Sequence, residues 1–196
     1  GYAGTTNNYG ILMQAGAKVM TSGAGTITMN GTGGVGTTGN RGIYLTGANT
    51  AVSSVNGNVT LTGQGAGTTT SNEGIYLDTG ATVASTGSGA LTLTGHAGGT
   101  TVQGVYLNQT TAANTVMSAG GTVTLRSNQT IQLSKAHIAS PTAQLFNIVI
   151  NSDLDGNSSG RIALTTSNLL SSGGNITLGG GADPLTGNAF GVAGAV

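Results

Sequence analysis

The chain of 196 residues contains no cysteine, no tryptophan, only two prolines and very little charge. Charged residues make up 5% of the sequence, five basic and five acidic, whereas ordinary domains carry roughly 25%. Without cysteine, neither a disulfide framework nor a thiolate metal site can form. Without an excess of basic residues, the chain has no electrostatic attraction to nucleic acid, so we expect no nucleic-acid partner.

Long apolar runs are missing as well. No segment approaches the ~18 consecutive apolar residues that a membrane helix needs, so we expect no membrane insertion of this segment. Glycine is abundant, with 37 residues, but it follows no three-residue period, which excludes a collagen-like helix. The hydrophobic share of 37% and the zero net charge also separate the chain from charge-rich disordered proteins.

Three short motifs recur with a period close to 32 residues. The first, GTITMNG in its first copy, occupies residues 25–31, 57–63, 89–95 and 121–127. The second, GIYL in two of its copies, occupies residues 10–13, 42–45, 74–77 and 104–107. The third, with a central valine, occupies residues 17–22, 50–54, 81–85 and 114–118. Each copy alternates apolar and polar residues next to Gly or Asn, which is typical of short strands.

Residues 128–196 follow the same order at a shorter spacing. The corresponding segments are 130–134, 136–140, 147–151, 160–165, 168–172 and 174–180. The sequence therefore predicts an all-β chain, folded as a right-handed parallel β-helix (β-solenoid) of about six coils with three short strands each. We interpret 1–196 as a single solenoid segment of a longer repeat protein, with regular 32-residue coils in 1–127 and shorter ones in 128–196, because it starts and stops within a coil.

The alternation also assigns side chains to the core or to the surface. The first motif contributes an inward column that reads Ile27, Val59, Leu91, Val123, Ile148 and Ile176, and the second one that reads Ile11, Ile43, Ile75, Val105, Ile131 and Ile162. Between the inward positions of the second motif, Tyr44, Tyr76 and Tyr106 are predicted to stack on the outside. Such a stack would stabilise neighbouring strands; a sugar-binding or partner-binding stripe is the alternative.

A column of outward threonines follows the first motif, at residues 28, 60, 92, 124 and 177. Threonine is expected on a solvated strand because of its β propensity. A double threonine ladder on a flat solenoid would resemble ice-binding proteins. The companion column at 26, 58, 90, 122 and 175 is mixed, however, and Val149 interrupts the threonines. Ice binding is therefore a remote alternative.

Few residues offer catalytic chemistry. Polysaccharide-cleaving enzymes are common among three-stranded β-helices, and they need converging carboxylates or a metal with a base. Glu73 and Asp78 flank one predicted strand at opposite ends, and the positions that match Asp78 in adjacent coils hold Thr46 and Asn108. His96 and His137 are isolated. The sequence predicts neither an enzyme nor a cofactor. Calcium is the one ion whose binding stays an alternative.

A partial calcium-loop pattern lies in the C-terminal third. Asn151, Asp153, Asp155 and Asn157 supply alternating oxygen side chains around Gly156. The twelfth position is Ile162, which the core needs, in place of the bidentate glutamate. The pattern favours a polar Asx-type turn between two strands, and a weak calcium site is the alternative.

Two stretches resemble a known family. GNVTLTGQGAG with GIYLDTGATVASTGSGALTLTG, and IVINSDLDGNSSGRIAL with SSGGNITLGGGADPLTG, are similar to the repeat regions of filamentous-haemagglutinin-like giant adhesins of bacteria. The resemblance covers nearly the whole chain and implies a β-helix shaft exported to the outer surface of a Gram-negative cell. It also implies adhesion or fibre assembly, with host or neighbouring-cell surface glycans or proteins, or copies of the chain itself, as partners. The alternative is a carbohydrate-binding or partner-binding module that uses the tyrosines and loops such as 31–40.

Overall fold

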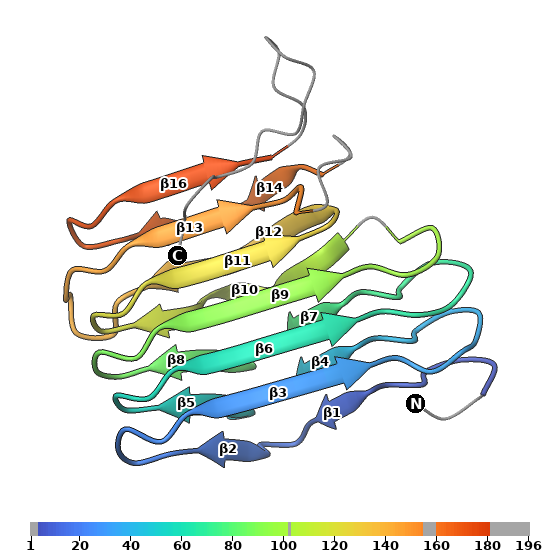
Figure 1. Cartoon of the computed structure of the whole chain (residues 1–196), viewed down its shortest axis with the longest axis horizontal. Coiled ribbons are helices and arrows are strands. Elements are labelled where there is room, and N and C mark those ends of the chain that lie inside the picture. Colours follow the sequence, from blue (N-terminus) through green and yellow to red (C-terminus); the bar gives the residue numbers. More distant parts are fainter. Residues whose placement is uncertain (1–3, 102, 155–159, 181–196) are drawn as a thin grey trace, which may run out of the picture.

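The computed structural model describes residues 4–101, 103–154 and 160–180. All regular structure in these residues is β-strand, and no helix long and apolar enough to cross a membrane occurs among them. Figure 1 shows parallel strands stacked coil upon coil, so the all-β, parallel β-solenoid prediction is confirmed.

One face of the solenoid is a six-stranded sheet. Its strands, in stacking order, are β3 (Ile27–Thr32), β6 (Val59–Gln64), β9 (Leu91–His96), β11 (Val123–Ser127), β13 (Ile148–Asn151) and β16 (Ile176–Gly179). Because every neighbouring pair is parallel, each strand must be followed by a crossover to the opposite face before the next one begins.

The opposite face is a ten-stranded sheet made of two columns. One column contains β1 (Ile11–Met13), β4 (Ile43–Thr46), β7 (Ile75–Asp78) and β14 (Ile162–Thr165). The other contains β2 (Lys18–Met20), β5 (Ala51–Ser54), β8 (Thr82–Ser85) and β15 (Leu169–Leu170). Two long strands, β10 (Gln103–Ser118) and β12 (Thr130–Ala139), run through both columns.

The winding is right-handed, as predicted. In Figure 1 the chain runs along β3 at the front, crosses behind through β4 and β5, and returns to the front as β6, one strand higher. Each column has strands at six successive levels, and the five steps between them make about five turns, close to the predicted six coils.

The strand register confirms the alignment of the repeats. Ile27 pairs with Val59 and Val59 with Leu91, while Ile43 pairs with Ile75 and Ile75 with Val105. The second motif starts at Gly74 and next at Gly104, an interval of 30 residues in place of 32, yet β10 still pairs in register with β7 and the columns stay intact. Most of the predicted inward residues form one continuous core, joined by Phe146, which the repeat alignment did not place there. Ile11 and Ile162 are partly buried and pack against this core, whereas Ile176 is 44% exposed and does not belong to it.

The merging of two columns in β10 differs from the three short strands predicted for each coil. In the first three coils the corner between the columns carries Gly16, Gly47 or Gly80, each with positive φ. At the same corner β10 reads Gln-Thr-Thr-Ala-Ala over 109–113, with no glycine to make that bend. The strand therefore continues, and a register shift against β12 between Asn108 and Ala113 accommodates the extra residues.

Candidate functional site

The predicted tyrosine stack is present on the outer face of β4, β7 and β10. Tyr44 pairs in register with Tyr76, and Tyr76 with Tyr106, because the three strands are stacked without a shift at these residues. The ring centroids of Tyr44 and Tyr76 are 5.2 Å apart and those of Tyr76 and Tyr106 are 5.1 Å apart. These spacings lie in the range of favourable aromatic pairs.

Two further residues belong to this cluster and were not predicted from the sequence. The ring of Tyr9, from the segment before β1, lies 5.3 Å from that of Tyr44. We call Tyr9, Tyr44, Tyr76 and Tyr106 the tyrosine ladder. The guanidinium carbon of Arg41 lies 4.8 Å and 4.5 Å from the ring centroids of Tyr44 and Tyr76, which is cation–π geometry.

Arg41 is also held by an ion pair between adjacent coils. Its Nε donates to Oε2 of Glu73 over 2.6 Å, and the two side chains are only 14% and 7% exposed. Tyr9, Arg41 and Glu73 occupy equivalent positions 32 residues apart, directly before Gly10, Gly42 and Gly74. The carboxylate that the sequence offered as a catalytic candidate is therefore engaged in joining two coils.

The phenol groups of the ladder make hydrogen bonds along the same axis. The hydroxyl of Tyr44 donates to Oδ2 of Asp78 over 3.1 Å, and Nδ2 of Asn108 donates to the hydroxyl of Tyr76 over 3.0 Å. Oδ1 of Asp78 is buried without a hydrogen-bond partner. Thr46, Asp78 and Asn108 lie in one register column, so each of these bonds links neighbouring coils.

Burial favours the neutral form of Tyr44, Tyr76 and Tyr106 by raising the pKa of each phenol. It raises the pKa of Tyr76 to about 12, and it also raises the pKa of Tyr44, where the Asp78 carboxylate adds to the effect. The pKa of Tyr106 is raised by burial and by the negative charge of Glu73. A neutral phenol avoids placing a negative charge in this partly desolvated stack.

The contacts of the tyrosine ladder indicate whether it stabilises the solenoid or binds a sugar. Stacking of a sugar on tyrosine requires a free ring face. The rings of Tyr44 and Tyr76 are instead packed against each other and against the Arg41 guanidinium. The geometry thus favours the stabilising role over the sugar-binding stripe.

A second ladder, formed by asparagines, was missed in the sequence. Asn8, Asn40 and Asn72 are buried at the corner that precedes β1, β4 and β7. Oδ1 of Asn40 accepts from Nδ2 of Asn8 over 2.7 Å, and Oδ1 of Asn72 accepts from the backbone N–H of Asn40 over 2.9 Å. The hydroxyl of Thr101 continues the ladder by accepting from the N–H of Asn72 over 2.8 Å.

The structure covers half of the proposed calcium loop. Oδ1 of Asn151 accepts the backbone N–H of Asp153 over 3.1 Å, which forms the favoured Asx turn. Asp153 is 2% exposed, while Asp155 and Asn157 lie outside the described residues. No group of three or more His, Asp or Glu able to hold a metal occurs in the part of the chain that is described. Calcium binding stays a prediction.

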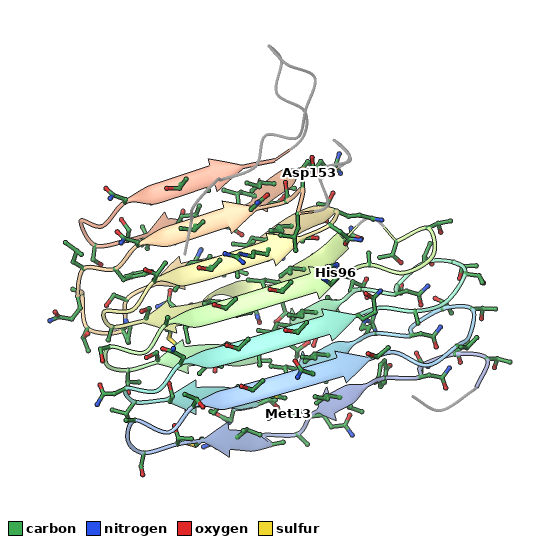
Figure 2. All side chains as sticks on the ribbon, in the orientation of Figure 1. Met13, His96 and Asp153 are labelled. Atoms are coloured by element: carbon green, nitrogen blue, oxygen red, sulfur yellow. The ribbon has the colours of Figure 1, made fainter. Side chains whose placement is uncertain are left out.

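The remaining candidate residues are dispersed over the solenoid. His96 ends β9, whereas Asp153 follows β13, two strands further along the same sheet (Figure 2). His137 lies on β12 in the opposite sheet, where its Nδ1 accepts the N–H of Asn168 over 3.0 Å. Among the residues described, the structure does not bring these side chains together.

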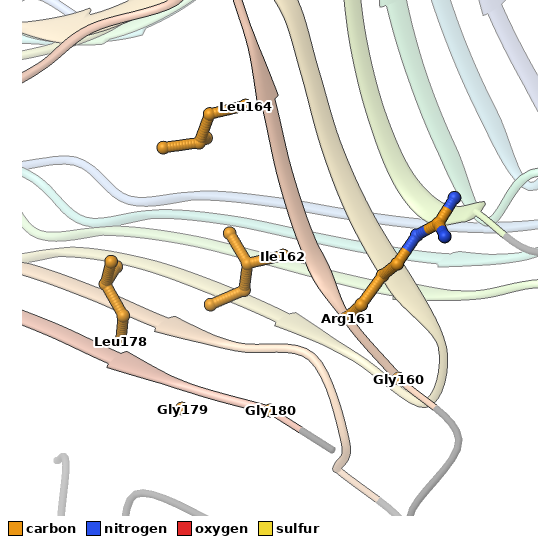
Figure 3. Close-up of a pocket in the computed structure, with 7 residues that line it drawn as sticks. All are labelled: Gly160, Arg161, Ile162, Leu164, Leu178, Gly179 and Gly180. Carbon is orange, nitrogen blue, oxygen red and sulfur yellow. The ribbon is translucent and has the colours of Figure 1, made fainter.

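A hollow of about 600 Å³ lies between the two sheets at β14 and β16. Ile162, Leu164 and Leu178 line it with apolar side chains, and Arg161 lies at its edge (Figure 3). Ile162 and Leu178 occupy the same register columns as the inward residues of earlier coils. The hollow is thus a continuation of the core, and the described residues that line it do not form an arrangement of polar groups that would orient a ligand.

Comparison of the chain with protein-family models, with curated proteins and with solved structures gave no match in any of the three. The fold by itself defines the class of protein: a parallel β-solenoid built from sequence repeats.

Proposed function

We propose that this solenoid is the non-catalytic structural shaft of a secreted or cell-surface bacterial adhesin or extracellular fibre. The proposal rests on one observation: the polar side chains of the solenoid interact along its axis, from one coil to the next. The ion pair, the phenol hydrogen bonds and the asparagine ladder all join residues 32 or 34 positions apart, which lie on adjacent coils. Polar side chains thus connect adjacent coils along the axis, as a structural shaft requires.

The surface of the solenoid supports the same role. Opposite charges, Arg41 and Glu73, are placed one above the other, so that the stack gains attraction where like charges would repel. A chain without net charge also avoids long-range repulsion between rods that lie side by side. The sequence resemblance to adhesin repeats adds the extracellular location to the proposal.

Antibody fragments raised against the folded segment test the location and the role together. If the segment is an exposed shaft, they should label intact cells of the source organism, and labelling should not require permeabilisation. They should leave attachment of the cells to a host or neighbouring surface unchanged, because a shaft does not contact the receptor.

Two results would contradict the proposal in different ways. Labelling that appears only after permeabilisation would place the segment inside the cell. The second result is that the antibody fragments block attachment in the parent strain but not in a strain whose chromosomal gene carries Tyr106→Ser. That result would favour a binding module that uses the tyrosine ladder. Unchanged attachment in a Thr70→Ser strain serves as the matched surface control.

A further inference from the structure

The outer surface of the six-stranded sheet carries a two-dimensional grid of threonines. In β3, β6, β9 and β11, Thr28, Thr60, Thr92 and Thr124 pair in register and form one column. The next outward position of the same strands forms a second column, in which Asn30 pairs with Thr62 and Thr62 with Thr94. We call Thr28, Thr60, Thr62, Thr92, Thr94 and Thr124 the threonine face.

The hydroxyls of this face are not used inside the protein. Within the described part of the chain, none of the six donates to or accepts from another protein group. Loop threonines behave differently: the hydroxyls of Thr37 and Thr69 each donate over 2.7 Å to a carbonyl of the neighbouring loop. The hydroxyls are therefore free because of their position on the outer face of the sheet, and not because threonine hydroxyls in general lack partners in this protein.

Thr124 shows that these hydroxyls face the solvent and not the protein. Its side chain is only 9% exposed, yet it has no hydrogen bond to the protein. A hydroxyl offers one donor and two acceptors, and the hydroxyl of Thr124 is not among the buried polar atoms without a partner, so it stays open to water. Water bound at the surface is the group that can satisfy it.

The geometry of the grid makes the bound water regular. Neighbouring strands are ~4.8 Å apart and alternate residues on one strand are ~6.7 Å apart, so hydroxyls and methyls repeat in two directions. Figure 1 shows the four strands running almost parallel, with little twist across the face. No charged side chain interrupts the columns before Arg126, which pairs with Thr94.

We propose that the threonine face binds ice, by holding first-layer water in rows that match the oxygen rows of an ice surface. The methyl groups keep the water between the threonines from reorienting, and the hydroxyls anchor it. Each contact is weak, but the contacts are repeated over four strands and form at the same time, which gives the effect of multivalent binding. The inference is independent of the proposed shaft function.

The test uses ice itself as the probe. The purified protein should shape ice crystals, produce a gap between freezing and melting temperatures, and be enriched in slowly grown ice. Thr60→Tyr and Thr92→Tyr place a bulky side chain in the centre of the grid, on strands that tolerate aromatic residues. Each should lose most of the freezing gap. Thr70→Tyr, an exposed loop position in the same coil as Thr60, is the matched control and should retain it.

The two parts of the threonine side chain can be separated. Thr60→Val keeps the methyl groups and Thr60→Ser keeps the hydroxyl, so both should reduce the freezing gap less than Thr60→Tyr does. Unchanged thermal unfolding of all variants shows that the fold is retained. A folded parent protein that neither shapes nor enters ice overturns the proposal. Dimers in sedimentation that Thr60→Tyr disperses, without ice activity, overturn it in favour of a contact between copies.

Discussion

Single residues in this protein act mainly through the residue one coil above or below. Asn40 illustrates this, because its amide group accepts from Asn8 on one side and contacts Asn72 on the other. Arg41 is similar: it forms its ion pair with Glu73 and lies over rings from two coils. A side chain that would contribute little alone thus stabilises the solenoid when equivalent residues in adjacent coils contact it.

Tyr76 leads to a prediction about alkaline pH. Its folded-state pKa of about 12 lies above the ordinary value of 10.0, so the protein is stabilised by the neutral phenol below pH 10. This stabilisation should be lost as the pH rises from 10 to about 12, because the unfolded chain ionises first. Denaturant unfolding across this range should show a smaller decline for Tyr76→Phe than for the parent protein.

The remaining tyrosines provide the comparison. Tyr44 and Tyr106 also have raised pKa values, so part of the alkaline decline should persist in Tyr76→Phe. Titration followed by phenolate absorbance checks the assignment directly. If Tyr76→Phe loses a group that ionises near pH 10, the burial argument for this residue is wrong.

The candidate site was only partly predictable from the sequence. Tyr44, Tyr76 and Tyr106 were predicted because they alternate with inward residues on a strand, and alternation states which way each side chain points. Asn40 and Arg41 lie at a corner, where no period fixes the direction of a side chain. Their equivalent positions 32 residues apart from Asn72 and Glu73 were visible, but spacing alone does not distinguish a buried ladder from an exposed one.

Strands in this fold were predictable in position and in register, and less so in length. The columns follow from the repeat because a one-residue shift would turn every apolar side chain outward. The fusion of two strands into β10 depends on the corner at 109–113, where a missing glycine lets the strand continue. Such a difference lies in one turn and has no effect on the hydrophobic pattern.

Close packing between the strand ends gives a prediction at the same scale. At Gly63, on β6, an added Cβ would collide with the backbone carbonyl of Gly74, the residue directly before β7 in the opposite sheet. Backbone cannot move aside as a flexible side chain can, so Gly63→Ala should destabilise the protein by about 1–3 kcal/mol. Chemical denaturation of the purified variant measures this change.

Gly23 is the matched control for this substitution. A Cβ at this turn position meets no atom within 4 Å, so Gly23→Ala should change the free energy of unfolding by no more than about 0.5 kcal/mol. Equal effects of the two substitutions would mean that the loss of glycine flexibility, rather than the collision at Gly63, determines the stability.

For the whole molecule, the repeat makes length an adjustable property. The core is continuous from Met13 to Ile150, and each coil contacts only its neighbours. Stability in such a protein is approximately a sum of coil terms and nearest-neighbour terms. The inter-coil ladders follow the same rule, because each of their contacts joins equivalent residues of two adjacent coils.

Removal of one complete coil tests this additivity. Deleting residues 43–74 joins Gly42 to Ile75 and restores the sequence of the second motif at the junction, so every later coil keeps its register. The shortened protein should fold, unfold cooperatively and show a smaller denaturant m-value, because less surface is exposed on unfolding. Deleting residues 43–58, half a period, should instead abolish folding, because apolar side chains are then stacked on corners. If both deletions fold equally well, the coil is not the structural unit, and the solenoid register does not determine the fold.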